Sequence, residues 1–330
     1  MTKVSIVIPN YNHAPFLGRR IDSVLDQTND DFEIIYLDDG STDDSHQVVE
    51  KYLSDGRIRV IRNTENSGCV FKQWNKGVRL AQGQYVWIAE ADDYADKRFL
   101  ETLVRVLDEN PKVGLVYCQS IRVDEDDRVV PAIEDFLRGE GRWANDFIND
   151  GRDECRYHLV SRNTIPNASA VLFRRSAYEA AGYADETMRL CGDWMMWVKL
   201  LLVLDIAFVA EPLNYYRTNS NTVRHRNRNR VTYFEEAYRV ARFTLDHITV
   251  PTEILEQACQ TLLGSWVNSI IQGRSLGPWR ETRNIYRNAK KVARRLRTRI
   301  IKNVASGISQ SFLPPLFRDR LGSNQEFTKP

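Results

Sequence analysis

Apolar positions in the first hundred residues follow two periods in turn. Short runs rich in β-branched and aromatic residues lie at 4–8, 32–37, 58–61 and 85–88. Between and after these runs, apolar residues recur at helical spacing over 15–26, 43–53, 70–81 and 97–109. Strands that alternate with helices of this length are typical of a parallel sheet wound with helices. The pattern therefore predicts an α/β fold with a mainly parallel sheet flanked by helices.

The rest of the chain divides into three parts. Strand patterns at 113–118, 168–173 and 206–210 and a helix pattern at 193–203 continue the α/β arrangement. Residues 124–163 are polar and irregular, and we expect a mobile insertion there. Beyond about residue 224 the pattern is helical only. We therefore expect an α/β domain over 1–224, with halves at 1–110 and 111–224, and a C-terminal helical region over 225–330.

Composition limits the class of protein. The chain is 42% hydrophobic and 27% charged with a formal net charge of +2, values that describe an ordinary globular protein. Its five cysteines are scattered and form no CxxC pair, so we interpret them as reduced thiols in a cytosolic compartment. The N-terminus lacks the features of a signal peptide, and the apolar stretch at 194–210 contains Lys199 and Asp205. We expect a soluble, cytoplasmic protein.

Polar residues follow three of the predicted strands at the point where each strand ends. They read PNYN at 9–12, DDG at 38–40 and EADD at 90–93. In an open α/β sheet, ligands bind outside the carboxyl ends of the strands. We therefore expect these three segments to meet in one crevice.

The first acidic segment contains Asp38 and Asp39. A turn explains part of it, because Gly40 favours a turn and Thr42 or Asp43 could cap the next helix. Capping leaves two further carboxylates at the strand end, where they repel each other without a donor or a cation. Nucleobase N–H groups or ribose hydroxyls would supply such donors, so the segment favours a ligand site.

The second acidic segment places Glu90, Asp92 and Asp93 within four residues. Each close pair of charges costs about 1 kcal/mol even in water, and a hard divalent cation with oxygen ligands would offset that cost. The alternative is a helix N-terminus, because these carboxylates and Asp96 precede a helix and would complement its dipole. A third carboxylate, Asp193, begins an apolar helix, where an aspartate is most often the N-cap.

Together these segments resemble glycosyltransferase family 2, whose members have the GT-A fold. The matching segments extend over about two-thirds of the chain and read SIVIPNYN at 5–12, DDGSTD at 38–43, NSG at 66–68, NKG at 75–77, AQGQY at 81–85, EADD at 90–93, GDW at 192–194 and PLNYYR at 212–217. Each motif is weak alone, but their order and spacing are specific. The resemblance implies a nucleotide-binding half at 1–110 and an acceptor half at 111–224.

The resemblance also implies a nucleotide-sugar donor, usually a UDP-sugar, and residues that contact it. These residues are Pro9, Tyr11, Asp38, Asp39, Asn66, Asn75 and Asp92. Pro9 and Tyr11 would pack against the base, and Asp39 would bond to it. Asn66 and Asn75 would shape the donor pocket.

The remaining roles concern the metal and the reaction. Similar enzymes hold Mn²⁺ or Mg²⁺ on the donor diphosphate, which implies Asp93, Asp92 and Glu90 as metal residues here. Asp193 matches the catalytic base, which would accept the proton of an acceptor hydroxyl as that oxygen attacks the anomeric carbon with inversion. The resemblance thus implies an inverting, metal-dependent glycosyltransferase in polysaccharide, lipopolysaccharide or glycan synthesis.

Two departures from the family pattern are visible. Many relatives have Asp where this chain has Glu90, whose longer arm changes the approach to a metal. Relatives also often place a His shortly after the Tyr-Arg motif, whereas this chain reads Arg217, Thr218 and Asn219. That role is therefore absent or moves to His225.

Two other classes of function remain as alternatives. One is a different nucleotide-dependent enzyme such as a dehydrogenase, but no GxGxxG cradle for a pyrophosphate follows the first strand. The other is a catalytically silent nucleotide-binding module, which the presence of Asp39, Asp92, Asp93 and Asp193 disfavours. The sequence does not identify the donor sugar, the acceptor or the oligomeric state.

The segment 280–304 is strongly basic and has apolar residues at helical spacing, among them Ile285, Ala289, Val292 and Leu296. Such a helix can lie on an anionic membrane, which would suit a lipid-linked acceptor at the inner face of the cell membrane. Alternatively, it packs on the catalytic domain and leaves its cationic face in solvent. Aromatics are sparse there and no nucleic-acid motif accompanies it, so we expect no nucleic-acid partner. A saccharide acceptor is equally compatible with the sequence.

Overall fold

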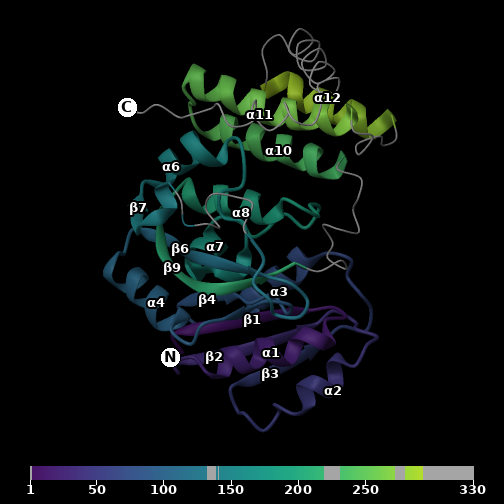
Figure 1. The fold of residues 1–330 in the computed structure, drawn as a ribbon, viewed down its shortest axis with the longest axis vertical. Helices are drawn as coiled ribbons and strands as arrows, with labels where there is room; N and C mark the ends of the chain where they lie inside the picture. Colours follow the sequence, from purple (N-terminus) through teal and green to yellow (C-terminus); the bar gives the residue numbers. More distant parts are fainter. Residues whose placement is uncertain (1, 132–138, 140, 219–230, 272–278, 293–330) are drawn as a thin grey trace.

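A central sheet organises the chain, whose computed structural model describes residues 2–131, 139, 141–218, 231–271 and 279–292. Its strands are β1 (Val4–Asn10), β2 (Phe32–Asp38), β3 (Ile58–Arg62), β4 (Tyr85–Ile88), β5 (Tyr94–Ala95), β6 (Val113–Val123), β7 (Phe147–Asn149), β8 (Val171–Arg174) and β9 (Asp205–Arg217). In the described residues they form a nine-stranded sheet of order β3-β2-β1-β4-β8-β6-β9-β5, with β7 paired to β9 (Figure 1). The expected halves of the α/β domain therefore share one sheet.

Strand direction confirms the mainly parallel sheet. Strands β3, β2, β1 and β4 are parallel neighbours, and β6 pairs parallel with β9. Strand β8 runs antiparallel to both β4 and β6, which returns β6 to the direction of β1. Among the described strands, only β5, β7 and β8 oppose the common direction. The carboxyl ends of β1, β2 and β4 consequently lie at one edge.

Helices cover both faces of this sheet (Figure 1). They are α1 (Ala14–Leu25), α2 (Ser45–Glu50), α3 (Val70–Leu80), α4 (Phe99–Glu109), α6 (Gly151–Glu154), α7 (Arg175–Ala180), α8 (Gly192–Leu201), α10 (Val231–His247), α11 (Thr252–Ile271) and α12 (Trp279–Val292). Alternate residues of β1 point to opposite faces, as in any strand. Ile6 and Ile8 join the core beneath α1 and α4, whereas Val7 joins the core beneath α3 and α8.

Helix α8 lies between the sheet and the C-terminal helices. Eight of its ten residues are buried, among them Trp194 and Trp197. It contacts β6 and α7 on one side and α10 on the other. This double burial explains why its sequence is apolar around the whole helix.

The expectation of an irregular insertion at 124–163 is wrong for much of that segment. It contains η1 (Gly141–Ala144), β7, α6 and η2 (Cys155–Leu159), and a further short helix, η3 (Ala168–Ala170), precedes β8. Aromatic packing supplies the reason. The ring of Phe147 lies 5.2 Å from that of Phe208, and Trp143 Nε1 donates to the Tyr117 hydroxyl at 2.9 Å. These contacts with β6 and β9 are remote in sequence, so local composition gave no sign of them.

The C-terminal helices stack on α8 at the end of the molecule remote from β3 (Figure 1). In α12, Ile285, Ala289 and Val292 are buried, while Arg283 and Arg287 are exposed. The apolar face of α12 therefore packs within the protein, as one of the two alternatives expected. Residues 293–304 of the predicted basic segment lie outside the described residues. Among the described helices, none combines the length and apolar character needed to cross a membrane.

Candidate active site

Asp38 and Asp39 lie at the end of β2, and both are 5% exposed. Asp38 Oδ1 accepts a hydrogen bond from the Ser41 N–H at 2.9 Å, which closes the turn after the strand. Asp39 Oδ1 accepts from Asn63 Nδ2 at 2.6 Å, and its Oδ2 accepts from the Ser67 hydroxyl at 2.8 Å. Asp39 thus ties the segment after β3 to the end of β2.

Gly40 allows this close approach. Its φ of +75° is in the left-handed region, and a Cβ added there would lie 2.8 Å from the backbone nitrogen of Asn66. Asn66 itself is exposed, and its Oδ1 accepts from the Gly68 N–H at 2.7 Å. The predicted donor residue Asn66 therefore lies exposed beside Gly40.

Pro9 and Tyr11 lie at the end of β1, next to Asp38 and Asp39. Pro9 pairs with Leu37 in the sheet and is buried, whereas Tyr11 is 37% exposed. Asn12, with φ of 59°, turns the chain, and its Oδ1 accepts from the Thr42 N–H at 2.7 Å. The structure thus presents an aromatic ring at the sheet edge, where the prediction placed the nucleotide base.

Asn75 has a different setting from the other predicted donor residues. Its Nδ2 donates to the Ala184 carbonyl at 3.0 Å and to Glu186 Oε1 at 2.9 Å. Its Oδ1 accepts from the Tyr178 hydroxyl and from the Ala184 N–H, both at 2.9 Å. These four bonds use the full capacity of the amide, so any influence of Asn75 on a donor would act through the segment it holds.

Glu90, Asp92 and Asp93 follow β4 at the same sheet edge. Asp93 is 3% exposed, and its Oδ1 accepts from the Arg217 N–H at 2.8 Å. Glu90 Oε1 accepts from Trp74 Nε1 at 2.8 Å. Asp92 is partly exposed. The three predicted metal residues therefore differ in accessibility, and Asp93 has one oxygen directed into the protein.

Burial and mutual repulsion disturb this acidic segment. Burial, followed by the charge of Asp92, raises the pKa of Glu90 to about 8 and that of Asp93 to about 7. Arg20 of α1 is fully buried, and burial lowers its pKa to about 10 against the opposing effect of these carboxylates. It remains cationic at neutral pH. Its Nε donates to the Glu90 carbonyl at 2.8 Å, while its two terminal nitrogens find no hydrogen-bond partner among the described residues.

Arg217, at the end of β9, clamps the same segment. Its Nε donates to the Asp92 carbonyl at 2.8 Å, and its terminal nitrogens bond to the Asp124 carbonyl and to Asp127. The side chain is 2% exposed. It thus joins the acidic segment after β4 to the residues that follow β6.

The donor set can be tested against a divalent cation. Among the described residues, no three His, Cys, Asp or Glu side chains converge to form a complete metal site. When ionised, Glu90, Asp92 and Asp93 carry three negative charges against one positive charge on Arg20, which leaves two to balance. Mg²⁺ and Mn²⁺ sites often use one or two carboxylates and complete the shell with substrate phosphates. The residues fit a cation shared between the protein and a diphosphate.

Asp193 lies in the first turn of α8 and is partly exposed. Its Oδ2 accepts from Asn163 Nδ2 at 3.1 Å, and its Oδ1 accepts from the Trp194 N–H at 2.7 Å. The N-cap residue of α8 is Cys191, two residues before Asp193, so Asp193 is not the N-cap.

Helix α3 connects the acidic segments. Gln73 Nε2 donates to Asp39 Oδ1 at 2.7 Å, and the next residue, Trp74, donates to Glu90 Oε1 at 2.8 Å. Two neighbouring side chains of one helix therefore contact the carboxylates that follow β2 and β4. Asp39 and Glu90 therefore lie on the same side of α3.

The same helix also contacts the start of α8. A Cβ added to Gly192 would come within 2.4 Å of the Phe71 ring, so only glycine fits this contact. Further along, the rings of Trp74 and Trp197 are 6.1 Å apart. Asp193 follows Gly192 directly. Phe71, Gln73 and Trp74 thus gather three acidic segments that are far apart in sequence around one end of α3.

Sequence reasoning missed several residues of this site. Arg20 looked like an ordinary charged residue of an amphipathic helix, and no local signal marks it as buried. Arg217 had a signal, since it ends the PLNYYR motif. His225, suggested as a substitute for a missing histidine, lies outside the described residues.

Comparison with known proteins defines the class. The model of glycosyl transferase family 2 matches residues 5–180, more than half of the 330 residues. The chain belongs to glycosyl transferase family 2. Glycosyltransferase GlyG of Streptococcus pneumoniae is 36% identical over 235 residues, which are 67% of this chain and 72% of GlyG. The chain spans 62% to 87% of the lengths of four curated relatives that it matches.

Solved structures confirm the GT-A fold. Residues 1–349 of Staphylococcus aureus TarS, in complex with UDP-GlcNAc, superpose with a TM-score of 0.67 at 20% identity, covering 99% of this chain and 94% of that one. The mannosyltransferase PcManGT of Pyrobaculum calidifontis, in complex with GDP-Man and Mn²⁺, gives a TM-score of 0.53 at 16% identity, covering 93% and 87%. At these identities the likeness concerns the fold.

Proposed function

We propose that this protein is an inverting glycosyltransferase that moves a sugar from a nucleoside-diphosphate sugar, a UDP-sugar, to an acceptor hydroxyl. The observation that carries the proposal is the contact of α3 with all three acidic segments. Through Gln73, Trp74 and Phe71 it joins Asp39, Glu90 and the Gly192–Asp193 pair. A nucleotide, a diphosphate and an acceptor oxygen need these three groups near one another.

The nucleotide would lie across the ends of β1 and β2. The exposed ring of Tyr11 offers a surface for the base, and Pro9 supports the strand end beneath it. Asp39 Oδ2 accepts one bond, from the Ser67 hydroxyl, and retains a lone pair that a base N–H could use. Asp38 shapes the turn that carries Ser41.

The diphosphate would lie beside the segment after β4. Asp92 and Asp93, supported by Glu90, would hold Mn²⁺ or Mg²⁺ there, and Asp92 and Glu90 are both more accessible than the buried Asp93. When bound, such an ion stabilises the negative charge that develops on the leaving diphosphate. Arg20 keeps the acidic segment folded by partly neutralising it, and Arg217 fixes its backbone.

Asp193 would act as the general base. Its carboxylate would take the proton of the acceptor hydroxyl while that oxygen attacks the anomeric carbon from the side opposite the leaving group. Asn163 holds one carboxylate oxygen by its amide, which limits rotation of the side chain. The base is thus fixed from the segment that precedes β8.

A panel of nucleotides and nucleotide sugars tests the proposal. With Mn²⁺, we expect UDP and at least one UDP-sugar to raise the melting temperature, since a ligand at 100 times its Kd adds about 2.7 kcal/mol. Radiolabelled sugar should then pass to water or an acceptor. Stabilisation without turnover would favour the silent binding module. No stabilisation by any nucleoside diphosphate would contradict the proposal.

We propose a saccharide or lipid-linked acceptor that approaches from the side of α6 and the C-terminal helices, with the catalytic domain ending near residue 224. Arg283, Arg287 and Lys290 are exposed on α12 and suit peripheral contact with an anionic membrane at its cytoplasmic face. Sedimentation with anionic and neutral liposomes at low and high salt distinguishes this contact from simple packing of α12.

A further inference from the structure

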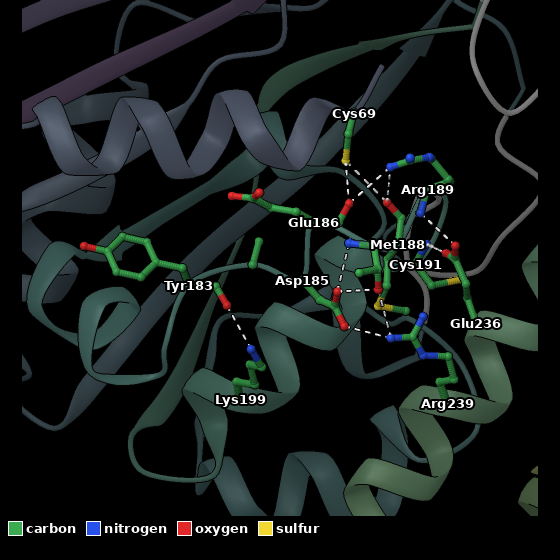
Figure 2. A network of polar contacts seen from close by, with 12 residues as sticks. Cys69, Tyr183, Asp185, Glu186, Met188, Arg189, Cys191, Lys199, Glu236 and Arg239 are labelled. Atoms are coloured by element: carbon green, nitrogen blue, oxygen red, sulfur yellow. Dashed lines mark hydrogen bonds and ion pairs between the residues drawn. The ribbon is translucent and has the colours of Figure 1, made fainter. Parts of the chain in front are cut away.

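The segment 184–191, which leads into α8, is held from two directions (Figure 2). On the α3 side, the Cys69 thiol donates to the carbonyls of Glu186 and Met188 at 3.4 and 3.5 Å. Asn75 bonds to Ala184 on the same side. These contacts come from the nucleotide-binding half of the fold.

The second set of contacts comes from α10, in the C-terminal region. Glu236 Oε1 accepts from the Arg189 N–H at 2.7 Å, and its Oε2 accepts from the N–H groups of Leu190 and Cys191, both at 2.8 Å. One turn further along α10, Arg239 donates to Asp185 at 2.8 Å. Figure 2 shows Glu236 directed at the backbone of this segment from α10.

The Glu236 carboxylate holds the backbone at the N-cap of α8 and just before it. N–H groups at this point have no carbonyl partner within the helix and require an acceptor from elsewhere. Cys191, at the N-cap, makes no capping bond with its side chain. Glu236, 45 residues away, accepts from the N–H groups of Cys191 and its two predecessors. It is 4% exposed, so little water competes for these bonds.

We propose that Glu236 is a positioning residue for Asp193, an inference that rests on the function proposed above. The backbone that Glu236 fixes ends two residues before Asp193, on the same helical turn. With Glu236 intact, the donors ahead of α8 are satisfied from α10. Without it, the N–H groups of residues 189–191 would lose their acceptor, and the backbone would shift to reach another one, which would move Asp193 away from the acceptor hydroxyl. One side chain of α10, Glu236, therefore helps to place Asp193 from the C-terminal region.

Glu236→Gln tests this role, with Glu235→Gln as the matched control. A glutamine at 236 keeps one oxygen that can accept, but its NH₂ group would face a backbone N–H, so two donors would oppose each other. Glu235, the neighbour on α10, accepts from Asn284 of α12 instead. We expect Glu236→Gln to lower kcat about 10–100-fold, as small displacements of catalytic groups do, with the donor KM within about twofold. Glu235→Gln should keep wild-type kcat.

A double-mutant cycle separates positioning from general stability. In an Asp193→Asn background, adding Glu236→Gln should change kcat by less than about twofold, because both substitutions act through one group. An equal loss in both backgrounds, an unchanged kcat in the single variant, or a change confined to KM would each overturn the role. If Glu236→Gln does not fold, Glu236→Asp, which keeps the charge on a shorter arm, undergoes the same cycle. A wild-type protein without turnover would instead overturn the proposed function itself, and this role with it.

Discussion

The proposed function assigns the nucleotide to the end of β2, the nucleotide edge, and the general base to the start of α8, the base side. These two regions are built from contacts of different range. At the edge, Asp38 closes a turn three residues away, at Ser41, within one short motif. On the base side, Glu236 holds Cys191 across 45 residues and from another region of the fold. Strand ends in an α/β sheet bring their own polar residues to the ligand, so motif and site coincide. A helix start inside the molecule depends on whatever packs against it.

The largest effect should come from Asp193→Asn, which tests the base side directly. The amide cannot accept a proton, so turnover should fall by ~10²–10⁴-fold. Binding of UDP, measured by calorimetry, should survive because the nucleotide edge is untouched. Near-wild-type turnover would remove Asp193 from its proposed role.

Removal of divalent ions tests the nucleotide edge. Treatment with EDTA should reduce turnover by more than about 100-fold. A bound metal stabilises the negative charge that develops on the leaving diphosphate by several kcal/mol, and its removal raises the barrier by that amount. Added Mn²⁺ or Mg²⁺ should restore it. Asp92→Asn should weaken this restoration. Full activity after exhaustive chelation would exclude the metal role of the segment at 90–93.

Asp39→Asn should show a smaller effect on turnover, weakening donor binding and lowering the melting temperature, because Asp39 also accepts from Asn63, Ser67 and Gln73. Hydrogen bonds to a charged group are worth about 1.5–3 kcal/mol, so the Kd for UDP should rise about 10-fold or more. Asp44→Asn is the matched control, because Asp44 is exposed at the N-cap of α2, five residues further along, and bonds to Gln47. Equal effects of the two substitutions on the Kd would place the base away from Asp39.

Gly192→Ala should have the smallest effect, and it tests the junction between the two regions. Its Cβ would meet the Phe71 ring at 2.4 Å, and such overpacking costs about 1–3 kcal/mol of stability. Gly56→Ala is the control, since a Cβ there meets nothing within 4 Å. Equal melting temperatures for the two variants would show that α3 and α8 separate easily.

Much of the fold could be predicted from the sequence. The period-two and helical patterns predicted β1 to β4 and their helices within a few residues, because each of these elements is amphipathic or fully buried in a simple way. The family resemblance and the GT-A fold are confirmed. Strand β6 was predicted to end at residue 118 but continues to Val123, because its pairing with β9 resumes after a bulge.

The supporting residues of the site were harder to predict. The buried arginine Arg20 and the carboxylate Glu236 have ordinary surroundings in sequence, and only tertiary contacts distinguish them from surface charges. Asn75 shows the converse case. The resemblance implied a place near the donor, and the structure shows an amide whose four bonds all go to protein groups. The roles of the predicted site residues themselves remain predictions.

The bonds from α10 to the backbone ahead of α8 limit how this enzyme can be recombined with its relatives. A chimera that exchanges only the C-terminal helices would remove the carboxylate that accepts from three backbone N–H groups ahead of α8, although its junction would lie far from Asp193 in sequence. Exchanges intended to change the acceptor substrate should therefore transfer residues 184–191 together with α10. Otherwise a hybrid could retain its nucleotide affinity yet lose turnover.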